Sequence, residues 1–342
     1  MHHLISALPK AELHVHLEGT LEPEMLLALA KRNQLTLPYD TPEAVLAARN
    51  FHDLPSFLRA YYAGTQVLVT EQDFYDLTYA YFFERAAADN IVYVEPFFDP
   101  QAHTSRGVAF DTIISGICRA QLDAAAMLGV KSNLIMCFLR DMSAESAMQH
   151  LEMSIPFRHW IIGVGLDSDE KSNPPAKFAE VFAKARKLGY KLTMHCDVNQ
   201  ENSTQHIHQC LHLIDVDRID HGINALESDE LCATITERGL GLTVCPVSNR
   251  FCANNLTGKE IRKMLRKGMY VTINSDDPAY FRAYLSDNLQ ALADDDHFTA
   301  DEIIMLIRNS FLASWLPDFL KRPYLMRIDQ ITRKFFTIAG AA

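Results

Sequence analysis

The sequence contains no apolar run that approaches the roughly 20 residues needed to span a membrane. Its first residues also lack the charged, apolar and small-residue zones of a secretory signal peptide. No internal repeat, low-complexity tract or Ser/Gly-rich linker marks a domain boundary. We therefore expect a cytoplasmic protein without a membrane partner, in which residues 1–342 form a single domain.

Positive charge is also scarce, because 32 Lys and Arg face 43 Asp and Glu, giving a formal net charge of −11 at pH 7. Binding to nucleic acid usually leaves a basic footprint, so we do not expect a polyanionic partner. The seven cysteines are an odd number and form no Cys-x-x-Cys pair, which argues against a disulfide framework. We therefore expect a small molecule as the partner, and a homo-oligomer is compatible with the sequence.

What the sequence does contain is an alternation of short apolar, often β-branched runs with longer stretches of helical spacing. This alternation is typical of βα units around a parallel sheet. We expect strands at residues 12–16, 91–96, 132–139, 161–166, 191–195, 218–221, 241–244 and 270–274. Helices are expected at residues 23–33, 71–88, 110–128, 175–188, 203–214, 228–237 and 259–267.

Eight strands predict an α/β fold of the (β/α)8 TIM-barrel type. The chain is longer than the roughly 250 residues typical of such a barrel. The extra length is placed in helices inserted after strand 1, at residues 42–48 and 54–67, and in C-terminal helices after Phe298. In such barrels the catalytic groups lie just beyond the carboxyl ends of the strands.

The most informative motif is Glu-Leu-His-Val-His-Leu-Glu-Gly at residues 12–19. Side chains alternate between the two faces of a strand, so His14 and His16 point to the same side and can bind one ion. Imidazole is the commonest ligand of zinc and similar metals, and a catalytic site needs about three protein ligands plus an open position. The pair therefore indicates a metal site with further ligands elsewhere.

Polar residues follow most of the other expected strands. These residues, which add to the pair of His14 and His16, are Glu95, Asp167, His195, His221, Ser248, Asn249, Asp276 and Asp277. His195 is a candidate third ligand, and Asp276 could supply a carboxylate oxygen as the fourth. His221 is placed to take a proton from a water activated at the metal.

Four ordered motifs make the sequence resemble the adenosine and adenine deaminase family of the amidohydrolase superfamily. They are Leu-Pro-Lys-Ala-Glu-Leu-His-Val-His-Leu-Glu-Gly-Thr (8–20), Arg-Ile-Asp-His-Gly (218–222), Val-Cys-Pro-Val-Ser-Asn (244–249) and Ile-Asn-Ser-Asp-Asp-Pro (273–278). The resemblance implies a distorted (β/α)8 barrel that removes ammonia or an amine from C6 of a purine by hydrolysis.

The resemblance also implies roles for individual residues. One zinc ion per chain would be held by His14, His16, His195 and Asp276. His221 would help to deprotonate the attacking water, and Asp277 would accept a hydrogen bond from the N7 side of the purine. Residues around Gly165, Asp167 and Ser168 would hold the far edge of the ring.

Two similarities favour a free base over a nucleoside as the substrate. Glu18 stands where nucleoside deaminases usually carry an aspartate that meets the ribose. Tyr-Val-Glu-Pro-Phe-Phe-Asp-Pro-Gln at residues 93–101 is similar to the adenine-deaminase form of that segment.

The loop after His195 departs from the family pattern. The family has His-Ala-Gly-Glu there, and its glutamate protonates ring N1, whereas this chain has Val198 at the matching position. Asp197 or Glu201 could replace that acid. Asp197 is favoured, because in a continuing strand it would share the face of His195; alternatively it caps the following helix.

A changed donor loop suggests a changed substrate. We predict a zinc-dependent deaminase of adenine or, preferentially, of an adenine with a substituent on N6. The alternatives are an adenosine deaminase, another hydrolase of the same superfamily, or a non-catalytic purine-binding relative, since fold and metal do not fix the substrate.

Overall fold

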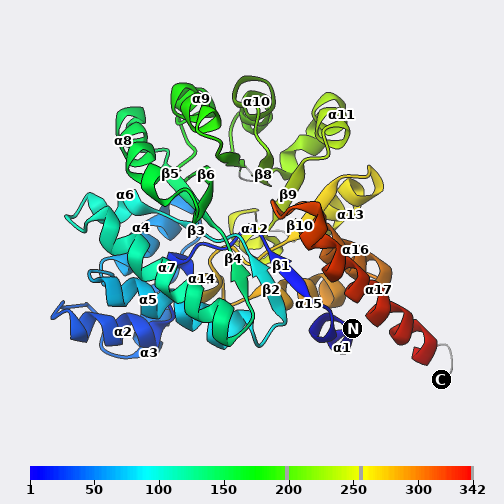
Figure 1. The fold of residues 1–342 in the computed structure, drawn as a ribbon, viewed down its shortest axis with the longest axis horizontal. Helices are drawn as coiled ribbons and strands as arrows, with labels where there is room; N and C mark the ends of the chain where they lie inside the picture. The colour runs from blue at the N-terminus through cyan, green and yellow to red at the C-terminus, as the bar shows by residue number, and fades with distance from the viewer. Residues whose placement is uncertain (197–199, 254–256, 340–342) are drawn as a thin grey trace.

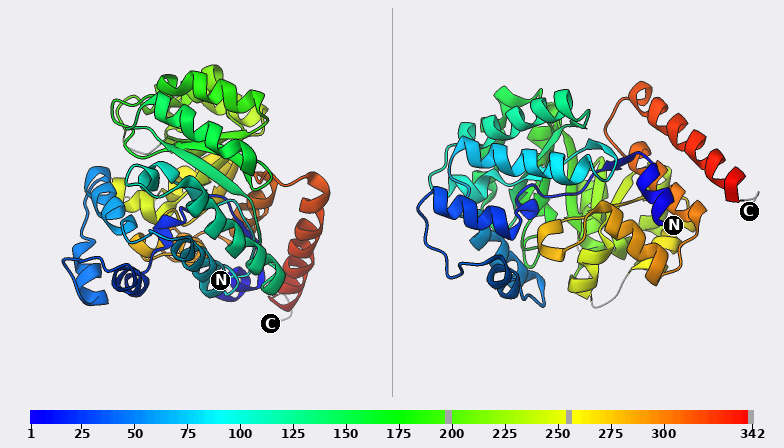
Figure 2. Two further views of the ribbon diagram at one scale, coloured as in Figure 1. Left: turned by 60° about the vertical axis from the view of Figure 1, so that its left-hand side comes forward. Right: turned by 90° about the horizontal axis from the view of Figure 1, so that it is seen from below.

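A computed structural model of the chain describes residues 1–196, 200–253 and 257–339 (Figure 1). Parallel strands lie at its centre and helices surround them (Figures 1 and 2). The strands are β1 (Lys10–Glu12), β2 (Ile91–Val94), β3 (Phe97–Phe98), β4 (Lys131–Ser132), β5 (Leu134–Leu139), β6 (Ile161–Asp167), β7 (Lys191–Cys196), β8 (Arg218–His221), β9 (Gly241–Val244) and β10 (Tyr270–Ile273).

The strands are arranged as a closed barrel. Seven of them are hydrogen-bonded in the order β10-β9-β8-β7-β6-β5-β3, and β2 lies between β1 and β4 in a second sheet. The residues after β1 close the ring, because Val15 forms a bridge with Asp276 beyond β10 and His16 forms a bridge with Phe97 in β3. The predicted (β/α)8 barrel is confirmed.

Helices cover the outside of the barrel, and the additional helices expected after strand 1 and after Phe298 are present. They are α1 (His2–Ala7), α2 (Pro23–Arg32), α3 (Pro42–Ala48), α4 (Leu54–Thr65), α5 (Glu71–Ala80), α6 (Pro100–Thr104), α7 (Phe110–Met127), α8 (Ala144–Ser154), α9 (Ala179–Lys187), α10 (Ser203–Gln209), α11 (Asp229–Glu237), α12 (Pro246–Ala253), α13 (Gly258–Arg266), α14 (Pro278–Phe281), α15 (Leu285–Asp295), α16 (Ala300–Leu312) and α17 (Asp318–Ala339). Six helices of the described residues were not predicted from the sequence: α1, α6, α8, α12, α14 and α15. Two expected helices end in π-helical turns, at Tyr81–Ala86 and Cys210–Ile214.

Helix α17 lies on the outside of the barrel, and its C-terminal end projects from the body of the molecule (Figure 2). It packs against α16. Among the described residues, no helix combines the length and the apolar character needed to cross a lipid bilayer.

The second strand of the barrel continues further than the sequence indicates. The expected strand ends at Pro96, whose missing N–H interrupts the ladder, but β3 resumes the pairing on the other side of the proline. Phe97 donates a backbone hydrogen bond to Val15 (2.8 Å), and β3 pairs with β5. The residue at the carboxyl end of this strand is therefore Asp99.

The barrel interior is filled by packed side chains. A Cβ atom on Gly165 of β6 would lie 2.6 Å from Sγ of Cys137, so only a glycine leaves space for that neighbour. Asp167 is two residues further along β6 and lies on the same face. Gly165 thus belongs to the packed interior, while Asp167 reaches the end of the barrel.

Glu95 is also an interior residue and not a group at the end of a strand, as the expected strand boundary suggested. It is fully buried and forms an ion pair with the equally buried Arg218. The Arg218 guanidinium lies over the ring of Trp315, 4.2 Å from its centroid. These residues form a charged layer inside the barrel.

Candidate functional site

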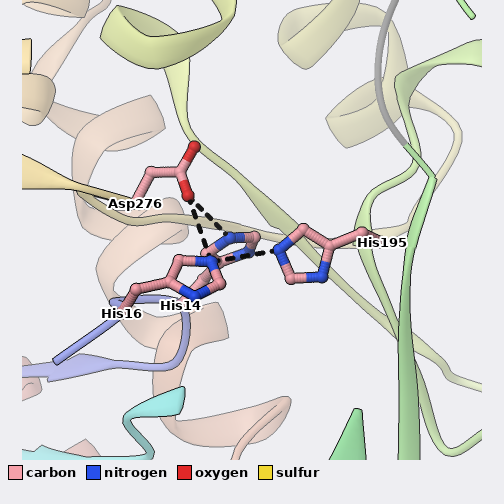
Figure 3. A group of neighbouring side chains, drawn as sticks. All are labelled: His14, His16, His195 and Asp276. Atoms are coloured by element: carbon pink, nitrogen blue, oxygen red, sulfur yellow. Dashed lines mark hydrogen bonds and ion pairs between the residues drawn. The ribbon is translucent and has the colours of Figure 1, made fainter. Parts of the chain in front are cut away.

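Four side chains from distant parts of the chain meet at the carboxyl ends of the strands (Figure 3). They are His14, His16, His195 and Asp276, and one ligand atom of each lies within 4.8 Å of the others. Nε2 of His16 is 3.2 Å from Nε2 of His195, and Oδ1 of Asp276 is 3.1 Å from Nε2 of His14. All four side chains are buried.

The backbone holds this cluster together. The N–H of Asp276 donates to the carbonyl of His14 (3.1 Å), and the N–H of His16 donates to the carbonyl of Asp276 (2.9 Å). Asp276 has φ of 64° and His221 has φ of 57°, in the left-handed region that non-glycine residues rarely adopt. Backbone strain of this kind concentrates at functional sites, where the surrounding structure enforces it.

A chain of hydrogen bonds fixes the tautomer of His14. The Thr243 hydroxyl donates its only proton to Asp220 (2.8 Å), so it accepts the hydrogen bond from Nδ1–H of His14 at 2.9 Å. Nε2 of His14, which faces the cluster, then carries a free lone pair. This arrangement of an imidazole backed by a hydroxyl and a carboxylate is the one that orients metal-binding histidines.

Burial sets the charge of the other ligand candidates. It lowers the pKa of His16 to about 4, and burial together with the neighbouring His14 and His16 holds the pKa of His195 well below its usual range. Burial alone would raise the pKa of Asp276, but His14 and the other surrounding histidines lower it well below its ordinary value. Neutral imidazoles and an ionised carboxylate are the donor set that zinc and similar transition metals bind. The four residues therefore fit a metal ion.

Two more residues of the predicted site lie beside the cluster. Nε2 of His221 is 4.0 Å from Oδ2 of Asp276, whose Oδ2 also accepts a hydrogen bond from the Ser248 hydroxyl (2.5 Å). Burial and the adjacent Asp276 carboxylate raise the pKa of Asp277 well above its usual range. Among the described residues, no group donates a hydrogen bond to Oδ1 of Asp277. A buried acceptor without a partner is suited to bind a ligand.

A cavity of about 220 Å³ opens onto the cluster. It is lined by His16, Asp53, Leu54, Pro55, Phe57, Leu58, Tyr61, Tyr62, Asp99, Asp167, Ser168, His195, Gln200, His221, Ser248, Asn249, Asp276, Asp277 and Phe281. The volume is below the 300 to 1,000 Å³ of typical drug-sized ligand pockets, so it suits a compact small molecule. Polar groups lie around the metal cluster, while α4 and Phe281 supply apolar side chains.

Two of the residues expected at the far edge of a substrate line this cavity, Asp167 and Ser168. Oδ2 of Asp167 lies 3.6 Å from Nδ1 of His16, and Ser168 accepts a hydrogen bond from Tyr62 (2.8 Å). Ser168 has φ of 73°, a third left-handed residue at the site. Gly165, which was expected with them, lies deeper, against Cys137.

Glu18, which is predicted from the sequence to bind the substrate, is not among the residues that line the cavity. Oε1 of Glu18 accepts the backbone N–H of Asp99 (3.1 Å) and lies 2.9 Å from Nε2 of His103. Arg106 donates to Nδ1 of His103 (2.8 Å), so Nε2 of that imidazole carries the proton and donates to Glu18. Oε1 of the carboxylate is thus committed to protein groups, while Oε2 is buried and has no hydrogen-bond partner among the described residues.

The structure describes only one of the two candidate proton donors, Glu201. Glu201 is exposed and does not line the cavity, although its neighbour Gln200 does. Asp197 lies outside the described residues.

Sequence reasoning missed the apolar and tyrosine side chains of α4 and three further polar residues of the site. Asp220 and Thr243 lie inside strands, and nothing in the sequence pattern indicated a functional role for them. In the structure they orient the histidines of the cluster. Asp99 follows β3 and lines the cavity, and extending the second strand across Pro96 would have found it.

A family model described as adenosine deaminase matches residues 9–331, and the chain belongs to this family. It is an enzyme of the deaminase class, a hydrolase acting on the C–N bond of an aminopurine.

Individual relatives extend over almost the whole chain. An adenine deaminase of Psychrobacter cryohalolentis is 48% identical over 329 residues, covering 96% of this chain and 98% of that protein. The crystal structure of an adenine deaminase from Arthrobacter aurescens matches with a TM-score of 0.92 and 40% identity, covering 96% of this chain and 100% of that one. A zinc-bound amidohydrolase from Burkholderia ambifaria matches with a TM-score of 0.89 and 25% identity, covering 98% and 94%.

Proposed function

We propose that the protein is a zinc-dependent hydrolytic deaminase of free 6-aminopurine bases, acting on adenine and preferentially on adenine alkylated at N6. The observation that carries this proposal is the four-ligand cluster beside a small cavity that is also lined by apolar side chains. Relatives that share almost the whole length of the chain are adenine deaminases.

His14, His16, His195 and Asp276 would hold one zinc ion. Three nitrogen ligands and one oxygen ligand fit zinc, and the resolved tautomer of His14 presents a lone pair to the centre of the cluster. When bound, the ion would lower the pKa of a coordinated water to roughly 7 and so provide a nucleophile at neutral pH.

The protein side chains then supply positioning and proton transfer. Water adds to C6 of the purine, and His221 takes a proton from it. Asp277, with its unpartnered Oδ1, would hold the N7 side of the ring. As the C6–N bond breaks, the exocyclic nitrogen takes the proton that His221 removed from the water and leaves as ammonia or an amine. The added hydroxyl loses its own proton, and a 6-oxopurine remains.

Attack at C6 is easier when ring N1 is protonated, because the ring then accepts the incoming electron pair. Of the two acids predicted from the sequence, Asp197 is the one that we propose for this step. Glu201 is exposed and lies away from the cavity wall, which makes it a poor donor.

The apolar wall supports the preference for N6-alkylated bases. Helix α4 contributes Leu54, Phe57 and Leu58 to the cavity, and α14 contributes Phe281. Leu54 and Leu58 are only half-buried, so each has apolar surface left for a ligand to cover. Covering such surface is favourable by roughly 25 cal/mol per Å².

The decisive experiment compares kcat/KM of the zinc-loaded enzyme for adenine, N6-methyladenine, N6-isopentenyladenine and adenosine. We expect the free bases to be used well and the N6-alkylated bases best. A clear preference for adenosine contradicts the proposal, and preference for adenine over both alkylated bases contradicts its second part. Zinc content is measured on the same preparation, so that a weak activity is not mistaken for poor loading.

A further inference from the structure

Asp99 is a buried carboxyl group in the cavity wall that neither the metal cluster nor the proposed chemistry uses. It is 1% exposed, and one of its carboxyl oxygens lies within 4.8 Å of one of Asp167. Tyr61 donates to its Oδ2 (3.4 Å). Within the described part of the chain, no group donates a hydrogen bond to its Oδ1. A buried acceptor in this state costs free energy unless a ligand or water completes it.

The location of Asp99 relative to the metal cluster determines what it can touch. The His16 ring lies between His195 and Asp167. Its Nε2 is 3.2 Å from Nε2 of His195, and its Nδ1 is 3.6 Å from Oδ2 of Asp167. Asp99 lies beside Asp167, and one ring nitrogen of His16 and one carboxyl oxygen each of Asp99 and Asp167 lie within 4.8 Å of one another. A flat ring with its reacting carbon at the metal cluster would extend past His16 toward Asp99.

The edge of a 6-aminopurine opposite C6 distinguishes a base from a nucleoside. A free base can carry a proton on N9, and that N–H is a hydrogen-bond donor. In a nucleoside, N9 is bonded to the sugar and has no proton, and the sugar occupies the space next to it. A carboxylate oxygen at this edge therefore favours the base twice, once by pairing with N9–H and once by excluding a substituent.

We propose that Asp99 is a specificity-determining residue that accepts a hydrogen bond from the N9–H of a free purine base and excludes substituents on N9. The inference rests on the proposed function and refines it, because it names the group that separates bases from nucleosides. The resemblance assigned that discrimination to Glu18, which does not reach the cavity.

Glu18 serves in this arrangement as a positioning residue. Its Oε1 accepts the backbone N–H of Asp99 (3.1 Å) and a hydrogen bond from His103, which Arg106 orients in turn. Asp99 is followed by Pro100, the first residue of α6, so the Glu18 contact fixes the backbone just before that helix begins. The glutamate therefore acts on the base through Asp99.

The test compares two ligands that differ only at N9. Steady-state kinetics with adenine and 9-methyladenine, which cannot present an N9–H, are measured on the wild-type enzyme and on Asp99→Ala and Asp99→Asn. For the wild type we expect kcat/KM to favour adenine strongly. In Asp99→Ala the ratio of the two kcat/KM values should fall by about 3- to 10-fold, the worth of one net hydrogen bond. The loss should be mainly in KM for adenine, and 9-methyladenine should be used as well as before or better.

Equilibrium binding gives a second readout that does not depend on turnover. Hypoxanthine and 9-methylhypoxanthine are titrated calorimetrically into the same proteins, and the preference for hypoxanthine should shrink in Asp99→Ala. Asp99→Asn keeps the shape and a neutral acceptor, so it should lie between wild type and Asp99→Ala. Asp141→Ala removes an exposed carboxylate that does not line the cavity, and it should leave both ratios unchanged.

The outcomes separate this inference from the function that it refines. If the wild type prefers free bases but Asp99→Ala lowers kcat/KM equally for adenine and 9-methyladenine, Asp99 is not the N9 selector and the inference fails alone. If the wild type prefers adenosine to adenine, the proposed function fails as well. Should Asp99→Ala not fold, the binding ratio in Asp99→Asn decides, and a ratio equal to that of the wild type overturns the inference.

Discussion

Oδ2 of Asp220 lies 3.6 Å from Nδ1 of His195, on the side of the imidazole that faces away from the ligand cluster. The other oxygen of this carboxylate accepts the Thr243 hydroxyl (2.8 Å), which in turn contacts Nδ1 of His14. Thr193 donates a further hydrogen bond to Oδ2 (2.6 Å). One fully buried carboxylate thus orients two ligand histidines without touching the metal position.

The first prediction concerns this carboxylate. Asp220→Asn should weaken zinc affinity by about 10- to 100-fold, because the amide holds the two histidines less firmly and makes them less basic. A competition titration against a chromophoric chelator measures the change. Asp229→Asn, which alters an exposed carboxylate on α11, serves as the matched control. Equal zinc affinity in Asp220→Asn and wild type would show that the ligands need no such support.

The second prediction concerns removal of the metal. Chelation should abolish turnover and lower the thermal stability, and zinc should restore both. A ligand that binds only the folded state stabilises it by about 2.7 kcal/mol at a free concentration 100 times its Kd. Thermal unfolding at increasing zinc concentrations measures this effect.

His14→Ala provides the control for metal removal, because it deletes one of the four candidate ligands. Its melting temperature should hardly respond to zinc. A wild-type protein that keeps full activity after zinc and other transition metals have been removed would contradict the proposed site.

The third prediction separates the two candidate acids of the loop after β7. Asp197→Asn should lower kcat by about two orders of magnitude or more, as expected when a general acid is lost. Glu201→Gln should have a mild effect, since its side chain is exposed and outside the cavity wall. Single-turnover measurements with adenine isolate the chemical step. Small effects of both substitutions would assign protonation of N1 to another group.

Much of the site could be predicted because its geometry is local or periodic. The alternation of side chains along a strand brings His14 and His16 to one face, whatever surrounds them. His195 and Asp276 follow clear apolar runs, and parallel strands that close into a barrel bring their carboxyl ends together. The cluster of four is therefore visible in sequence patterns alone.

Other parts depend on contacts that no pattern records. Pro96 looks like the end of a strand, yet the barrel requires the chain to resume pairing at Phe97, which moves the functional position from Glu95 to Asp99. Glu18 has the right place in its motif, but His103, 85 residues away, binds its carboxylate and directs it away from the cavity. Both differences arise from long-range hydrogen bonding.

The fourth prediction tests the apolar wall of the cavity. Leu58→Asn should lower kcat/KM for N6-isopentenyladenine by about 10-fold, because apolar contact worth 1 to 3 kcal/mol is lost. Adenine, which has no alkyl group, should be used nearly as well as before. The ratio of the two kcat/KM values is the measurement. Arg59→Asn, on the exposed side of the same helix, is the control. An equal loss for both substrates would place the alkyl group elsewhere.

The fifth prediction concerns the charged layer beneath the site. Glu95 accepts hydrogen bonds from Tyr93 (2.9 Å) and from the backbone of Trp315 (2.7 Å), and it neutralises the buried Arg218. Glu95→Gln leaves that guanidinium with less compensation, so the free energy of unfolding should fall by about 3 to 5 kcal/mol. Urea denaturation of the zinc-loaded protein measures the loss.

The catalytic constants of the folded Glu95→Gln enzyme decide between an interior and a catalytic role. Glu95 is absent from the cavity wall and is surrounded by protein groups, so kcat and KM for adenine should stay within about two-fold of wild type once zinc content is matched. Arg218→Met should be destabilised in the same way, and combining the two substitutions should cost less than the sum of the single effects, because neither partner is then left as an isolated buried charge. A large fall in kcat at unchanged stability would instead mean that Glu95 takes part in the chemistry.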